Sequence, residues 1–209
     1  MANERLAPFR DYDEHDVINL FAWDSASAPT SFAGRIVAGT VVKVKTGFSN
    51  TAELSMLGDV GASYDNVVSQ RYGVPAEITA AGEADAAPLG LMLFDVSEHD
   101  ENGELLKFNP SKAAEMQACV LGQAVPVATK GIFLVDWTNA ASDGSTPAVG
   151  GGVYAQGAGN LSADSTLGGP SIGKFLGEVD ADGKVLILSL IHISEPTRRT
   201  PISYAVFCL

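Results

Sequence analysis

The sequence contains few of the residues on which much protein chemistry at neutral pH depends. Among 209 residues there are 2 cysteines and 3 histidines, and 13 lysines and arginines stand against 25 acidic residues. The net charge of -12 argues against binding to nucleic acid, which requires a basic face. No apolar run approaches the roughly 20 residues that cross a bilayer, and no apolar signal-peptide region follows the first residues. We therefore expect neither nucleic acid nor a membrane as a partner.

Apolar residues are plentiful by comparison. They make up 46% of the sequence, against 18% for charged residues, which is typical of a chain that buries a core. The 22 glycines and 10 prolines separate short clusters of valine, isoleucine, threonine and alanine. Many short strands divided by turns favour an all-β fold, a small barrel or a sandwich.

Several stretches have the β-branched or alternating pattern of a strand. They lie at 35–45, 74–79, 89–96, 124–129, 131–135, 153–155, 172–179 and 184–187. Residues 50–73 and 138–152 lack this pattern and are expected to be loops.

Two hairpin turns and one short helix complete the expected elements. The Asn-Gly pair at 102–103 predicts a turn with 105–108 as its returning strand, and residues 180–183 predict a second turn. Residues 110–121 predict the helix. Asn109 suits its cap and Pro110 its first position, and Gly122 suits the position after its end.

The first 33 residues differ from the rest, because aromatic residues are scattered there among charges without a clear period. We predict an extended N-terminal arm at 1–33 and a β-barrel domain at 34–187. Widely spaced apolar anchors in such an arm suit contact with a neighbouring protein, and an irregular N-terminus is an equal alternative. The predicted partner contacts are Phe9, Tyr12, Phe21 and Trp23, with Leu20 as a further anchor.

The composition changes abruptly after Ile187, and a native, strand-rich C-terminus is the alternative for residues 188–209. They match the translation of a sequencing adapter, of which one fixed part encodes 188–198 and a second encodes 202–209 in the same frame. We predict that this segment is not native and that the sequence derives from an assembled environmental read. His192 and Cys208 then carry no functional meaning.

Two patterns imitate ligand-binding loops. Residues 168–174 follow the first seven positions of a phosphate-binding loop, but Phe175 stands where a Ser or Thr must bind Mg²⁺, and a strand is expected to follow. Glu178, Asp180 and Asp182 imitate a calcium loop. The strand-like residues after them favour a hairpin turn instead.

The remaining candidates are isolated. His15 and His99 stand among carboxylates that could bind a metal or shift the histidine pKa. Solvated loops are the favoured interpretation, with metal binding at His99 left open. Cys119 lies in an apolar setting without a basic activator, which is typical of an inert buried thiol. We predict no catalytic, cofactor or metal site, and therefore no enzyme.

The second half of the chain has a recognisable succession of short motifs. Its parts are 122–127, 130–133, 152–155 with 159–162, 172–176 and 182–187. This succession resembles the small β-barrel head decoration (cement) proteins of tailed bacteriophages. Residues 87–93 and 109–116 look like a structural protein of marine tailed phages, so that the resemblance covers about 75–187.

The resemblance implies a homotrimer on the capsid exterior, with the major capsid protein as partner. It implies a virion protein made in the cytoplasm of a bacterial host, with no catalytic residues and no cofactor. Many copies, each burying a modest area, would gain affinity through multivalent seating. A phage tail, baseplate or receptor-binding module is the alternative. A trimeric β-fold nucleotide hydrolase is a remote one, because no Arg-Ser-Ser-Gly-like segment is present.

Overall fold

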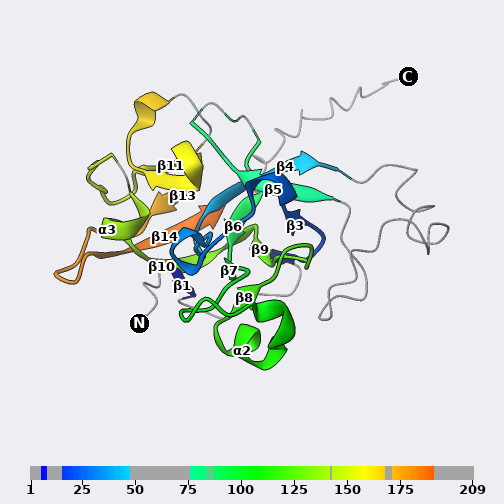
Figure 1. The fold of residues 1–209 in the computed structure, drawn as a ribbon. Helices are drawn as coiled ribbons and strands as arrows, with labels where there is room; N and C mark the ends of the chain where they lie inside the picture. Colours follow the sequence, from blue (N-terminus) through cyan, green and yellow to red (C-terminus); the bar gives the residue numbers. More distant parts are fainter. Residues whose placement is uncertain are drawn as a thin grey trace, which may run out of the picture.

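The computed structural model describes residues 6–8, 16–47, 76–83, 85, 87–141, 143–167 and 171–190. In this part of the chain the fold is mainly β, with two six-stranded sheets and one two-stranded sheet (Figure 1). The predicted fold class is therefore confirmed, and the sheets fit a sandwich-like arrangement.

The first sheet has the order β1-β10-β14-β13-β11-β12, and every neighbouring pair in it is antiparallel. Its strands are β1 (Leu6–Pro8), β10 (Lys130–Asp136), β14 (Lys184–Leu190), β13 (Ser171–Phe175), β11 (Gly152–Gln156) and β12 (Asn160–Ser162). Alternate residues of β10 and β14 are buried, as the pleat of a strand requires. The inward residues include Phe133, Val135, Val185 and Ile187.

The second sheet has the order β2-β9-β6-β4-β5-β3. Its strands are β2 (Val17–Ile18), β9 (Val127–Ala128), β6 (Gly90–Met92), β4 (Val41–Thr46), β5 (Glu77–Ala80) and β3 (Ala22–Trp23). Strands β3 and β5 run parallel, and the other pairs are antiparallel. Strands β7 (Asp95–Val96) and β8 (Ala118–Cys119) form the small parallel sheet.

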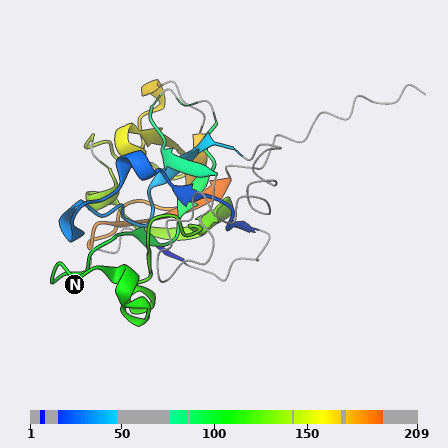
Figure 2. The ribbon, with the colours of Figure 1, turned by 45° about the vertical axis from the view of Figure 1, so that its right-hand side comes forward.

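Short helices fill the connections between strands. They are η2 (Ser25–Ser27), η3 (Phe32–Gly34), η4 (Leu106–Phe108), α2 (Pro110–Glu115), α3 (Trp137–Ala140), η5 (Gly157–Gly159) and η6 (Ser165–Leu167). Helix α2 lies at the lower end of the molecule in both ribbon views, apart from the two large sheets (Figures 1 and 2). It packs on a small core of its own, made by Leu106, Ala113, Ala118 and Val120.

Two larger cores hold the sheets. The first contains residues of both large sheets, among them Phe133 and Phe175 from one and Val41 and Leu91 from the other. The two sheets therefore pack against each other across this core. The second core belongs to the second sheet and contains Trp23, Val42, Ile78, Met92 and Val127.

The N-terminal segment pairs with two consecutive strands, β9 and β10, which belong to different sheets. Strands β9 and β10 are separated by Thr129 alone, yet they belong to different sheets. Strand β1 pairs with β10, and β2 pairs with β9. The Thr129 backbone N–H and hydroxyl both donate to the carbonyl oxygen of Asp16, at 2.8 and 3.0 Å. The same N-terminal segment therefore joins both sheets at the point where the chain crosses between them.

Strand β3, at the edge of the second sheet, has neighbours on both sides. Ala22 pairs with Glu77 of β5 on one side and bridges Ala124, just before β9, on the other. The backbone N–H of Val125 also donates to the carbonyl of Phe21 at 2.8 Å. The described part of the segment predicted as an arm therefore lies along this chain's own sheets.

Several expected elements differ in extent. The strand expected at 89–96 is divided between β6 and β7, which belong to different sheets, and the strand expected at 35–45 begins only at Val41. Helix α2 ends at Glu115, well before Gly122, because Gln117 has a φ of 50° and β8 begins directly afterwards. The expected returning strand at 105–108 is mostly the helix η4, with a single bridge between His99 and Leu105. The strand expected at 172–179 ends at Phe175. The expected loop at 50–73 lies outside the described residues.

Strand β14 extends beyond residue 187, into the segment that matches an adapter. Leu188 and Ser189 pair with β10 and with β13. The Ser189 side chain faces the core at 2% exposure, and its hydroxyl has no hydrogen-bond partner within the described part of the chain. A buried position in a central strand is thus filled by a polar group that the core does not satisfy. Residues 191–209 lie outside the described ranges, and their non-native origin stays a prediction.

We expect Ser189→Ala to raise the free energy of unfolding by about 1 kcal/mol, because it removes a buried hydroxyl without a partner. Urea denaturation measures the change. The matched control is Ser162→Ala in β12 of the same sheet, where the equally buried hydroxyl donates to Asp143. The control should lose about 1–3 kcal/mol. A loss of stability in Ser189→Ala would contradict the assignment.

Candidate functional site

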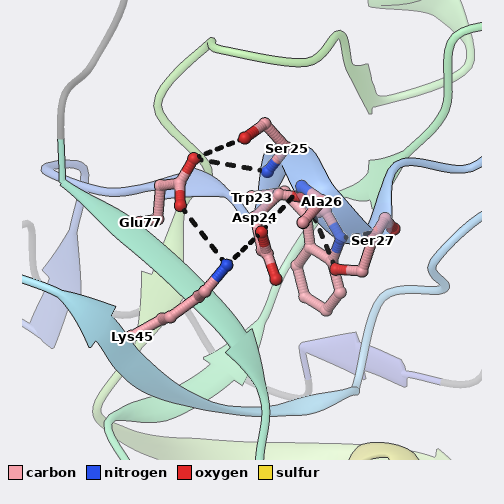
Figure 3. Close-up of polar contacts among 7 residues, drawn as sticks. All are labelled: Trp23, Asp24, Ser25, Ala26, Ser27, Lys45 and Glu77. Carbon is pink, nitrogen blue, oxygen red and sulfur yellow. Dashed lines mark hydrogen bonds and ion pairs between the residues drawn. The ribbon is translucent and has the colours of Figure 1, made fainter.

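A polar cluster fastens the N-terminal segment to the second sheet (Figure 3). Lys45 at the end of β4 places its Nζ 2.6 Å from Oδ1 of Asp24 and 3.8 Å from Oε2 of Glu77. Asp24 directly follows β3, and Glu77 begins β5. The Ser25 hydroxyl donates to Oε1 of Glu77 at 2.9 Å. Side chains from three neighbouring strands therefore meet around one ammonium group.

Asp24 and Lys45 keep their charges at neutral pH. The hydrogen bond from Lys45 lowers the pKa of Asp24, and it outweighs the effect of burial, which acts to raise that pKa. The bond to Asp24 in turn raises the pKa of Lys45. A lysine held between two carboxylates is suited to fixing strands and unsuited to accepting a proton or attacking a substrate.

The predicted partner-contact residues divide into two groups. Phe9 and Tyr12 lie outside the described residues. Trp23 is 3% exposed, and its indole N–H donates to the carbonyl of Ser27 at 3.1 Å. Phe21 packs partly buried against the same core. In this fold Phe21 and Trp23 thus serve the chain's own core, and the large exposed apolar side chain of the segment is Leu20, at 56% exposure.

The acidic turn beside His99 is held together by hydrogen bonds to its own carboxylate. Asp100 is 0% exposed and accepts hydrogen bonds from the backbone N–H groups of Asn102 and Glu104 and from Nζ of Lys112. The bond from Lys112 is the largest influence on Asp100 and lowers its pKa. The Asp100 carboxylate, which a metal ion would need as a ligand, is thus already engaged in hydrogen bonds of the turn. The described residues contain no group of three or more possible metal ligands.

The two loop imitations are ordinary β structure where they are described. Asp180 Oδ1 accepts from the backbone N–H groups of Asp182 and Lys184, at 3.0 and 2.8 Å, and so closes its own hairpin turn. Gly183 takes the positive φ of 77° that this turn needs. Lys174 lies within β13, where it pairs with Leu188. A phosphate loop would require a helix at this point.

Cys119 is buried, and its burial determines how readily the thiol ionises. Burial, followed by the negative charge of Asp95, raises the pKa of the thiol to about 11. Almost no thiolate is present at neutral pH, and the thiolate is the reactive form. The prediction of an inert thiol agrees with this environment.

The structure also shows a serine–aspartate pair that sequence patterns did not indicate. The Ser162 hydroxyl donates to Oδ2 of Asp143, and the backbone N–H of Ser145 donates to Oδ1 of the same residue at 2.9 Å. Burial acts to raise the pKa of Asp143, but these bonds outweigh it and lower the pKa. The pair holds the loop after α3 against β12. No local motif marks it, because its members are separated along the chain.

Comparisons with protein-family models, with curated proteins and with solved structures found no match to this chain. Among the described residues, no helix is both long and apolar enough to cross a membrane.

We expect Trp23→Ala to lower the free energy of unfolding by about 3–5 kcal/mol, because it leaves a large cavity in the second core. Chemical denaturation measures the loss. The matched control is Leu20→Ala, three residues earlier and exposed, which should stay within about 0.5 kcal/mol. Equal effects of the two variants would contradict the burial of Trp23.

Acid should weaken the Asp100 turn. A carboxylate whose pKa is lowered on folding stabilises the fold above its ordinary pKa of 3.8, and this contribution is lost as the pH falls through the lower, folded value. We therefore expect Asp100→Asn to be destabilised relative to the unchanged protein at pH 6, with a gap that narrows steadily below pH 3.8. Urea titrations across this range measure the gap. Asp182→Asn, in the exposed second turn, is the control and should stay within about 0.5 kcal/mol.

Proposed function

We propose that this protein is a non-enzymatic structural protein of a tailed-phage virion, a decoration protein that binds the outer capsid surface and stabilises the head. One observation carries the non-enzymatic part. In the described chain, the polar groups that could perform chemistry instead hold the fold together. Asp100 closes a turn, Ser162 and Asp143 fasten a loop, and Cys119 is buried.

The arrangement of strand edges supports a protein displayed in many copies. The outer strands of the first sheet, β1 and β12, have three residues each. The outer strands of the second sheet, β2 and β3, have two residues each. Long unpaired edges promote aggregation, and short or paired edges avoid it. This suits a protein that is crowded on a surface.

The charge distribution supports a place on the outside of a particle. In the described part of the chain, five basic side chains form ion pairs with aspartates: Arg35, Lys43, Lys45, Lys112 and Lys130. The surface therefore keeps most of its acidic excess. Such a surface repels packaged DNA and is compatible with solvent.

The contact with the major capsid protein needs a revised location within the N-terminal segment. Trp23 belongs to the core, so we place the capsid contact on the exposed side of that segment, around Leu20. Deleting residues 1–33 would remove β1, β2 and β3 together, and it would test folding rather than binding. A homotrimer whose contacts lie on the sheets remains part of the proposal.

The test combines gene context with binding. A long read across the gene identifies its neighbours, and co-expression with an adjacent major capsid gene shows whether the protein sediments with assembled capsids. We expect co-sedimentation, weakened by Leu20→Asp and unchanged by Phe108→Asp, an exposed apolar position near α2. A protein that stays in the supernatant contradicts the head location. Neighbouring tail-sheath or baseplate genes would move the protein to the tail, which is the alternative.

A further inference from the structure

We propose that the hollow beside α3 is a docking site for a basic segment of a partner protein that carries an apolar side chain at its tip. The inference goes beyond the proposed function, because it rests on the geometry of this end of the first sheet and holds for a head or a tail location. The hollow lies between α3, the loop at 144–147 and the β13–β14 hairpin. Figure 1 shows α3 and the hairpin at the same end of the molecule.

The hollow has an apolar floor. Trp137, Ala141, Pro147 and Val179 line it, with polar side chains of the loop between them. Its volume is about 350 Å³, near the lower end of the range of about 300–1,000 Å³ for ligand pockets. It is also open to solvent. These dimensions suit one or two inserted side chains better than a large cofactor.

The walls of the hollow are held in place before any partner arrives. The backbone N–H of Trp137 donates to the carbonyl of Gly183 in the hairpin at 2.8 Å, and its indole N–H donates to the carbonyl of Ser145 in the loop at 2.9 Å. Its ring meets Phe175 edge to face, with centroids 5.2 Å apart. One tryptophan thus ties both walls to the core. Such preorganisation lowers the entropic cost of binding.

Apolar surface continues outside the hollow. Val149, two residues after Pro147, is 63% exposed, and Leu176 in the facing hairpin is 45% exposed. They are close in the fold, because the backbone N–H of Gly150 donates to the carbonyl of Phe175 at 2.8 Å. Exposed apolar side chains grouped beside a preformed hollow are typical of an interaction site.

The charges around the hollow define the partner. Three exposed carboxylates are sequence neighbours of lining residues: Glu178 and Asp180 flank Val179, and Asp143 precedes Gly144. Asp143 and Asp180 also accept backbone N–H groups within their own turns. The exposed Lys184 stands in the same hairpin, and the carboxylates outnumber it. Facing charges of opposite sign favour association and exclude like-charged partners. The apolar tip should therefore stand between lysines or arginines. A second copy of this chain fits less well, because its own net charge of -12 is of the same sign.

The test uses the full chain and two synthetic peptides, a leucine flanked on each side by two lysines and the same leucine flanked by glutamates. Binding is followed through the NMR signal of the Trp137 indole N–H. We expect saturable binding of the lysine peptide only. Val149→Ser with Leu176→Ser should weaken it by about five- to tenfold, and Glu178→Lys should weaken it further as salt dependence falls. Leu20→Ser and Glu101→Lys, at exposed positions outside this end, are matched controls that should not change it.

Several results would overturn the proposal. These are no binding of the lysine peptide, equal binding of both peptides, or equal weakening by the controls. Self-association of the free protein, measured by sedimentation and abolished by the same rim variants, would assign the hollow to a second copy instead. None of these results depends on capsid binding. The proposed function can therefore fail while this inference holds, and this inference can fail while the proposed function holds.

Discussion

The crossing of one stretch of chain between the two large sheets is the constraint on which the rest of the structure depends. Strand β9 belongs to the second sheet and β10 to the first, with Thr129 alone between them. The N-terminal segment pairs with both strands and bonds twice to Thr129 through Asp16. It thereby stabilises the crossing between the two sheets, and through β3 it also covers the edge of β5 in the second sheet.

Many ion pairs of the described chain cross-link separate segments of the fold. Lys45 joins three strands through Asp24 and Glu77, and Lys130 pairs with Asp16 at 2.6 Å. Loops away from the crossing are also held by carboxylates, which there accept hydrogen bonds from backbone N–H groups inside a turn. Each such carboxylate stabilises its local structure and is correspondingly less able to serve a substrate.

The two surfaces singled out for binding differ in how they are built. Leu20 is a single apolar side chain on a segment that is itself fixed by pairing. The hollow beside α3 combines an apolar floor, two exposed apolar side chains and several carboxylates. The first suits a broad contact repeated over many copies, whereas the second suits recognition of one particular segment. A virion protein that seats on a lattice could use both, since affinity accumulates over repeated weak contacts.

The sequence by itself determined the β class, both turns and the start of α2. Alternation of apolar residues, Gly103 and Gly183 in turns, and Pro110 at a helix start are local signals, which act over a few residues. Only the tertiary structure decided that Trp23 is a core residue, that Leu188 and Ser189 complete a central strand, and that Val149 and Leu176 lie close to each other. Alternation shows that a residue faces inward or outward but not which distant strand pairs with it. These features depend on pairing between segments far apart in the chain, for which no local pattern exists.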